Sequence, residues 1–358
     1  MSPFRVTSSA AALTAGLSLF CVGGTALAQP AAHTPDTMHA TPRFAVIRAT
    51  PQELAAQSGA LPTWSFTYTY NGQHYSDKFV GNAPTGAAVT VPAFIIPLKI
   101  VVAGQTFTTS TVQPNGKTAL KDTTASPIFK SNVDFKEAGV DLGKTQYEDA
   151  YQRESFWPTV LGNPGYHVLL GKPKVLPEVT LNVPSGSGSV GTEFGVKVAL
   201  VDINYMDGQL RSILAKNSQI TADSVPVFEA YDTYETSGGC CIGGYHSYNG
   251  TVPYMLFDYV TKVTPGAFSQ DVSALSHEMG EWLDDPFTNN NSPCGIYENG
   301  DPLEREANYG GYPYVVGTMT YNLQDLAQPP YFGAPASTTL DGRASFQGTV
   351  LSVCQNGA

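Results

Sequence analysis

Residues 276–286 read Ser-His-Glu-Met-Gly-Glu-Trp-Leu-Asp-Asp-Pro and follow an apolar run typical of a helix. On an α-helix, positions i and i+4 lie on one face, so His277 and Glu281 can bind one ion together. Glu278 follows His277 directly and comes close enough to act as general base on a water at that ion. The spacing is that of the zinc-peptidase signature His-Glu-x-x-His, with glutamate as the second ligand. The pattern therefore predicts a helical metal site.

The predicted helix extends over residues 269–285, with Ser269 or Asp271 as its N-cap. Apolar residues recur at helical spacing and form a stripe that faces the core. Pro286 ends the helix, so the motif falls on its last two turns. A plainer interpretation is that His277 and Glu281 form an ordinary i,i+4 pair on a solvated face.

A catalytic zinc needs three protein ligands and an open fourth position. Glu298 is the preferred third ligand, because a cluster of oxygen donors follows the helix there; Asp285 and Asp301 are the alternatives. This set of one imidazole and two carboxylates suits Zn²⁺, and also Mn²⁺, Fe²⁺ or Ca²⁺. His246 and Tyr297 are candidates for a donor to the oxyanion or the substrate.

Three segments together resemble a group of secreted zincin-like proteins: His277-Glu278-x-x-Glu281, Asp285-Pro286-Phe287 and Glu298-x-Gly300-Asp301. The group includes uncharacterised bacterial exported proteins and, more distantly, the plant phosphate-induced (EXORDIUM-like) proteins. The resemblance implies a zincin-like fold, with metal at His277, Glu281 and Glu298 and with Glu278 as the base. It extends over residues 272–301 and does not reach the N-terminal half.

The N-terminus has the pattern of an export signal. Arg5 precedes an apolar run over residues 10–22, and small residues predict cleavage near Ala28. This predicts a secreted or periplasmic protein with a signal peptide at 1–28, and the apolar run is too short for a membrane span. Residues 29–60 are predicted to be a disordered lead-in, since the stretch up to about Thr41 is rich in Ala, Pro and Thr.

The chain carries 30 acidic and 19 basic residues, a net charge of −11. The basic residues form no stripe, which argues against nucleic acid as a partner. A peptide or protein substrate is the expected partner of a catalytic site.

Four cysteines follow the predicted signal: Cys240, Cys241, Cys294 and Cys354. In an oxidising compartment they predict up to two disulfides. Because adjacent cysteines seldom pair with each other, Cys240 and Cys241 are each expected to reach a distant partner. A zinc site of four thiolates is the alternative. The glycine-dense segment around the adjacent pair, residues 238–246, is expected to be a tight loop.

The segments between these motifs predict an α+β fold: a β-rich region over 61–184 and a zincin-like metal-binding domain over 190–358. Residues 63–70 alternate with period two and precede Asn71-Gly72, a strong hairpin signal. Pro92 and Pro97 interrupt a strand candidate at 89–102, which favours a sheet edge or bulge. The Gly- and Ser-rich residues 184–189 are expected to be a flexible loop or domain joint.

These features favour an exported metal-dependent hydrolase, most simply a peptidase. The alternative is a non-catalytic extracellular or cell-surface protein with a structural or vestigial metal site.

Overall fold

The structure is a computed structural model that describes residues 43–137, 140–261, 268–293, 297–304, 306–328 and 332. The predicted signal peptide, its cleavage site, and the start of the predicted lead-in lie outside these residues. Among the described residues, no helix has the length and apolar character needed to cross a membrane.

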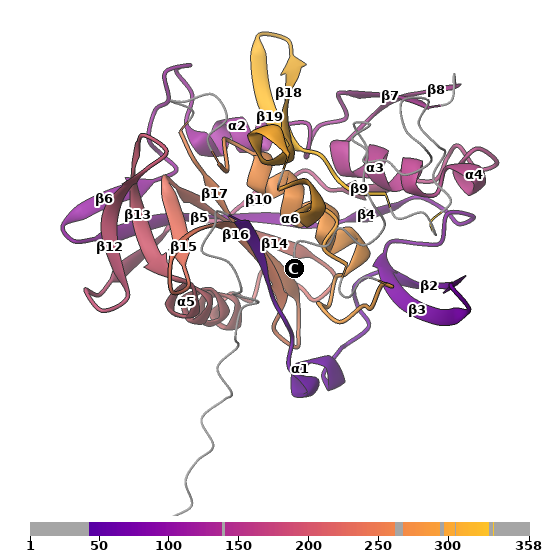
Figure 1. The fold of residues 1–358 in the computed structure, drawn as a ribbon, viewed down its shortest axis with the longest axis horizontal. Coiled ribbons are helices and arrows are strands. Elements are labelled where there is room, and N and C mark those ends of the chain that lie inside the picture. The colour runs from indigo at the N-terminus through magenta and orange to yellow at the C-terminus, as the bar shows by residue number, and fades with distance from the viewer. Residues whose placement is uncertain are drawn as a thin grey trace, which may run out of the picture. The chain divides into compact units, whose positions relative to one another are not determined.

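Strands dominate the described residues and helices pack against them, so the coarse α+β prediction is confirmed (Figure 1). The centre is a mixed eleven-stranded sheet. Its main path runs in the order β10 (Lys174–Val175), β5 (Ala93–Val102), β14 (Val225–Tyr231), β17 (Pro253–Tyr259), β16 (Cys240–Tyr248), β15 (Thr233–Thr236), β13 (Val196–Asp202) and β12 (Gly188–Glu193). Off this path, β1 (Arg43–Ile47) pairs with β16, while β6 (Gln105–Thr108) and β11 (Val179–Val183) pair with β5.

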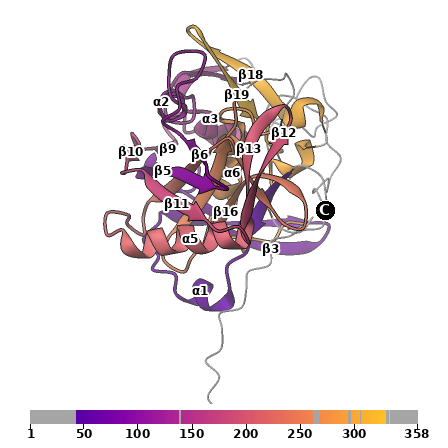
Figure 2. The same ribbon diagram turned by 90° about the vertical axis from the view of Figure 1, so that its left-hand side faces the viewer.

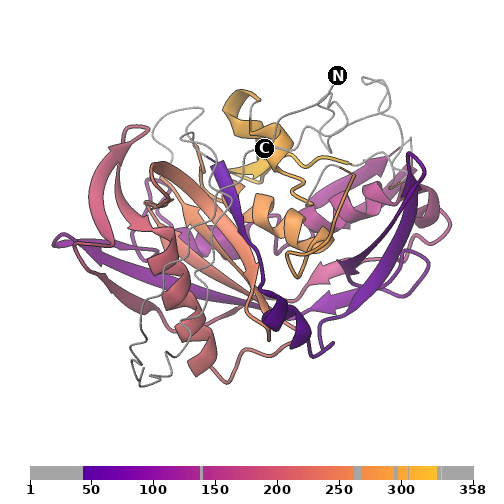
Figure 3. The same cartoon turned by 60° about the horizontal axis from the view of Figure 1, so that its bottom comes forward.

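Two helices cover opposite faces of this sheet, α5 (Ile203–Lys216) and α6 (Ser273–Asp284) (Figure 3). Side chains alternate between the faces of a strand, and β17 shows this: Leu256 joins the apolar core under α5, while Met255 joins the core under α6. Every residue of α6 is buried. The polar side chains of this helix therefore sit inside the protein and need partners there.

Smaller elements complete the fold. The helices are α1 (Pro51–Ala55), α2 (Ala119–Ala125), α3 (Tyr147–Ser155) and α4 (Trp157–Val160), with short 3₁₀ turns at Asp301–Leu303 and Ala307–Gly310. The two-stranded pairs are β2 (Thr63–Tyr70) with β3 (Gln73–Val80), β4 (Val89–Val91) with β9 (Val168–Leu170), β7 (Val133–Glu137) with β8 (Val140–Thr145), and β18 (Gly311–Val316) with β19 (Met319–Gln324).

Two of these strand pairs bear on the sequence predictions and on α6. The hairpin β2–β3 confirms the Asn71-Gly72 turn, since both residues have positive φ. The hairpin β18–β19 lies on the α6 side (Figure 2), where the amide of Gln324 donates to the Ser276 hydroxyl at 2.7 Å.

The predicted disordered lead-in over 29–60 is wrong for its second half. Residues 43–47 form β1, which pairs in parallel with β16 beside α6. The physical reason is the apolar run Phe44-Ala45-Val46-Ile47, all of which is buried in the core. Such a run regains on burial the free energy that its ordering costs.

The predicted boundary near 184–190 falls within the central sheet. Strand β5 from the first region pairs with β14 from the second, and β12 begins at Gly188. The positions of Pro92 and Pro97 suggested that β5 is a sheet edge. The structure instead places β5 inside the sheet, between β10 and β14. Pro97 lies where pairing with β14 ends and pairing with β11 begins at Leu98, so its missing N–H leaves no long gap in the ladder.

Two further local predictions are corrected. Residues 240–248 form the strand β16 and not a loop. The N-cap of α6 is Val272, with no side-chain cap. Asp271 does not cap the helix from its predicted position because its carboxylate accepts from the backbone and side-chain nitrogens of Asn322.

Candidate metal centre

The helix α6 brings His277 and Glu281 together as its spacing predicts. The Nε2 atom of His277 lies 3.0 Å from Oε1 of Glu281 and 3.4 Å from Oδ1 of Asp301. Neither His277 nor Glu281 is exposed to solvent. Although these atoms are close, neither ring nitrogen of His277 makes a hydrogen bond to a described residue. Lone pairs that converge without a shared proton are what a bound cation requires.

Glycines allow two backbone segments to approach this helix closely. A Cβ atom on Gly300 would lie 2.2 Å from Nδ1 of His277, and one on Gly244 would lie 3.2 Å from Oε1 of Glu278. Gly244 therefore allows β16 to pack closely against α6. The amide of Gly300 also donates to Oε1 of Glu281 at 3.1 Å, which holds the acidic loop against α6.

The third potential ligand beside His277 and Glu281 is Asp301. It forms a potential ligand group with His277 and Glu281, whose donor atoms all lie within 4.8 Å of one another. Glu298, the preferred ligand from the sequence, is buried and hydrogen-bonded through its carboxyl to Glu281. Asp285 accepts from the amides of Asn289 and Asn290 at the end of the helix. The geometry thus favours Asp301 as third ligand, with Glu298 beside it.

Glu278 faces β16, where its Oε2 atom lies 3.0 Å from Nδ1 of His246. Both side chains are buried. Burial lowers the pKa of His246 to about 3, helped by the nearby His277, so this imidazole is neutral at pH 7. The sequence candidate His246 therefore lies in the centre and contacts the candidate base directly.

Burial and then repulsion among carboxyls determine the electrostatics of the centre. Burial raises the pKa of Glu278 well above its usual range, and Glu281 and Glu298 raise it further. The pKa values of Glu281 and Glu298 are raised in the same direction, first by burial and then by neighbouring carboxylates. A divalent cation would relieve this repulsion, and the donor set fits one.

Glu304 is a member of this cluster that the sequence patterns did not indicate. Burial and Asp301 raise its pKa to about 8, and its Oε1 atom accepts from the amide of Phe44 at 2.5 Å. The Phe44 ring in turn lies 3.9 Å from the His277 ring. The only available signal was the spacing of Glu304 three residues after Asp301, which is too common to stand out.

The sequence candidate Tyr297 lies among aromatic side chains. Its hydroxyl donates to the hydroxyl of Tyr68 at 2.8 Å, and its ring packs on Phe79 and Phe332. The aromatic side chains of β2 and β3 provide this apolar surface, so the ring of Tyr297 serves packing. Packing is the more common role of tyrosine in a chain with 19 of them.

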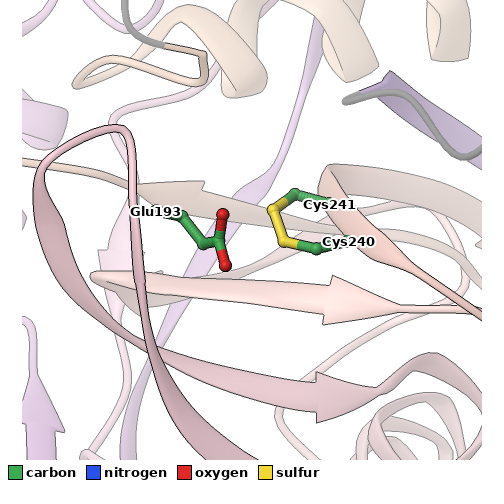
Figure 4. Close-up of side chains that lie close together, drawn as sticks. All are labelled: Glu193, Cys240 and Cys241. Atoms are coloured by element: carbon green, nitrogen blue, oxygen red, sulfur yellow. A yellow bond between two sulfur atoms is a disulfide. The ribbon is translucent and has the colours of Figure 1, made fainter.

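Cys240 and Cys241 form a disulfide with each other, which contradicts the expected long-range pairing. The peptide bond between them is cis, and their Cα atoms lie 3.0 Å apart. Figure 4 shows the Glu193 carboxylate facing this disulfide. These three residues could group around a metal, but bonded sulfurs are not thiolate ligands. Cys294 and Cys354 lie outside the described residues.

No family model matches this chain, and neither a curated protein nor a solved structure matches it.

Proposed function

We propose that this protein is an exported metal-dependent hydrolase, and specifically a peptidase. His277, Glu281 and Asp301 would hold the cation, with Glu298 supporting Glu281 and with Glu278 as the general base. The proposal retains the family resemblance of the motif, a zincin-like site in which glutamate replaces the second histidine.

The observation that carries the proposal is the convergence of His277, Glu281 and Asp301 on one buried point beside Glu278. The two helical donors alone would fit an ordinary ion pair. A third donor from a separate loop, held there by the Gly300 amide, is what a metal site needs in addition.

A divalent cation bound there would polarise a substrate carbonyl and make water a better nucleophile. Glu278 lies next to His277 on the helix and can accept the proton of the attacking water. Its raised pKa makes its carboxylate a stronger base than that of an exposed glutamate, and the protonated form can then return the proton to the leaving amine.

The donor set is harder than one of three histidines. Zn²⁺ remains the first choice for a hydrolase of this motif, while Mn²⁺, Fe²⁺ or Ca²⁺ also suit carboxylate-rich sites. Export is inferred from the signal-like N-terminus, and a vicinal disulfide is compatible with an oxidising compartment.

A non-catalytic protein with a structural metal site is the second candidate. One observation favours it: both helical donors are completely buried, whereas a catalytic site keeps a position open to substrate. The side chain of Asp301, which is 20% exposed, is the most accessible of the three donors. Substrate would therefore have to approach from the Asp301 side.

Replacement of Glu278 by Gln distinguishes the two candidates. The zinc-loaded variant should retain its metal and lose about 10²–10⁴-fold in peptide hydrolysis, because the general base is gone. The matched control is Glu178→Gln, at an exposed glutamate far along the sequence, and it should hydrolyse the same unstructured protein substrate at the wild-type rate. Equal rates in all three proteins, or no hydrolysis by the metal-loaded wild type, would favour the structural role.

A further inference from the structure

A second set of donors lies beside the first. His246 on β16 and the two glutamates Glu278 and Glu281 on α6 place one ligand atom each within 4.8 Å of the others. Nδ1 of His246 is 3.0 Å from Oε2 of Glu278 and 3.5 Å from Oε2 of Glu281. One imidazole and two carboxylates again form the set, now with a strand and a helix as its supports.

Glu281 belongs to both sets, and its two oxygens face different imidazoles. Oε1 lies 3.0 Å from Nε2 of His277, whereas Oε2 lies 3.5 Å from Nδ1 of His246. A carboxylate in this orientation can bridge two cations, and paired ions in proteins are typically about 3.5–4 Å apart.

The second set also contains buried polar atoms that lack partners. Among the described residues, neither Oε1 of Glu278 nor Oε2 of Glu281 makes a hydrogen bond, while Nδ1 of His246 hydrogen-bonds to Oε2 of Glu278. All three side chains are buried, so water does not freely solvate them. Buried polar groups left in this way are costly, and a cation at this point would satisfy both carboxylates.

We propose that a second divalent cation binds to His246, Glu278 and the Oε2 atom of Glu281, and that its binding inhibits hydrolysis. The proposal rests on the function proposed above, because it is the loss of Glu278 as a base that inhibits. A glutamate whose oxygens bind a cation cannot accept a proton from the attacking water. The second ion binds more weakly than the first, since the two positive charges repel each other across Glu281.

The test uses the full chain, stripped of metal and titrated with Zn²⁺. Bound zinc is measured by equilibrium dialysis, and hydrolysis is measured over the same range of free zinc. We expect two ions per chain, one tight and one at least about 10-fold weaker, which corresponds to about 1.4 kcal/mol. Hydrolysis should rise as the first ion binds and fall as the second binds.

Three variants assign the ions. His246→Gln should lose only the weak ion, and His277→Ala should lose the tight one. His74→Gln removes an exposed histidine as a matched control and should keep both. Should His246→Gln fail to fold, the wild-type stoichiometry still decides.

Saturation of the wild type at one ion overturns the second site. If that single ion is lost in His277→Ala, the metal site of the proposed function stands alone. If the ion persists in His277→Ala and is lost in His246→Gln, the ligand set of the proposed function is wrong as well. Two bound ions with undiminished hydrolysis would overturn the inhibition.

Discussion

The two faces of the central sheet neutralise their buried acids differently. On the α5 face, Asp207 accepts from Nε of Arg211 at 2.7 Å and from the Tyr254 hydroxyl at 2.5 Å. Arg211 also pairs with Glu53 of α1. On the α6 face, the basic side chains that contact the buried carboxyls of Glu278 and Glu281 are imidazoles, and the charges that raise the pKa values of these carboxyls are other carboxylates.

This difference indicates how each face reaches charge balance. A guanidinium is part of the chain and stays charged at any physiological pH, so Asp207 and Glu53 have a permanent cation beside them as soon as the protein folds. The α6 face must take up either protons or a cation from solution. Buried carboxyls with strongly raised pKa values cluster at functional sites, and this supports the proposed metal site.

Another pair of buried acids shows that buried carboxyls alone do not define a candidate metal centre. Glu235 on β15 and Asp258 on β17 are both buried, and β16 lies between their strands. Burial raises the pKa of Glu235 to about 8, and burial and then Glu235 raise the pKa of Asp258. Two carboxyls can balance by sharing one proton. The centre at α6 differs because imidazole nitrogens converge on the same carboxylates.

The largest expected effect is a pH dependence of the metal-free protein. Burial raises the pKa of Asp284 to about 7, of Asp285 to about 7 and of Glu304 to about 8. The unfolded chain releases these protons first, so stability should be greatest below about pH 4 for this group of residues and fall as pH rises to about 8. Each pKa unit per residue corresponds to about 1.4 kcal/mol.

Urea unfolding of the metal-free protein between pH 5 and pH 8 measures the slope of the unfolding free energy against pH. The α5 face should behave oppositely, because the hydrogen bonds from Thr50 and the charge of Arg211 outweigh burial and leave the pKa of Glu53 lowered. Its stabilising contribution is present above the ordinary glutamate range and is lost on acidification. Asp284→Asn should reduce the slope, and an unchanged slope would remove the cluster as its cause.

Arg211→Met tests the α5 face on its own. The substitution leaves Asp207 buried without its cation and should destabilise the protein by about 3–5 kcal/mol. Added zinc should stabilise the wild type and Arg211→Met equally, because the proposed metal site lies on the other face, so the difference in unfolding free energy between the two proteins should not change. A smaller difference in the presence of zinc would show that the two faces are not independent.

Metal should stabilise the wild type through the α6 face. At a free zinc concentration of 100 times Kd, the gain in unfolding free energy is about 2.7 kcal/mol. The gain should vanish in His277→Ala and persist in Arg211→Met, as measured by thermal unfolding with and without chelator. An equal gain in His277→Ala would mean that zinc binds elsewhere.

The smallest expected effect compares two glycines: Gly300, which packs against α6, and Gly208, which lies within α5. A Cβ on Gly300 would overlap the His277 ring, so Gly300→Ala should cost about 1–3 kcal/mol and weaken zinc binding. Gly208 lies within α5 with no atom within 4 Å of a Cβ, so Gly208→Ala should stabilise by about 0.5–1 kcal/mol. Tight zinc binding by Gly300→Ala would contradict the described packing of the acidic loop.

The sequence predicted those parts that depend on local spacing. The i,i+4 geometry of His277 and Glu281 and the hairpin after Tyr70 follow from helix and strand periodicity, so both could be derived from a few residues. Sheet pairing could not, because each residue of β5 that pairs with β14 lies 132 residues from its partner, as Ala93 and Val225 do, and the pairing depends on tertiary packing.

The same limit applies to the centre. The approach of Asp301 and Glu304 to His277 depends on Gly300 packing flat against the imidazole ring, which a spacing rule does not show. The apolar strand at Phe44 was overlooked because it follows a polar, proline-containing segment. His246 was named as a candidate, but its contact with Glu278 required knowing that β16 lies beneath α6.

The most direct measurement is anomalous scattering from crystals of the full chain grown with zinc. The account predicts a strong peak at bonding distance, about 2.0–2.2 Å, from His277 Nε2 and from carboxylate oxygens of Glu281 and Asp301. Zinc bound at other residues, with the imidazole of His277 free of metal, would contradict it.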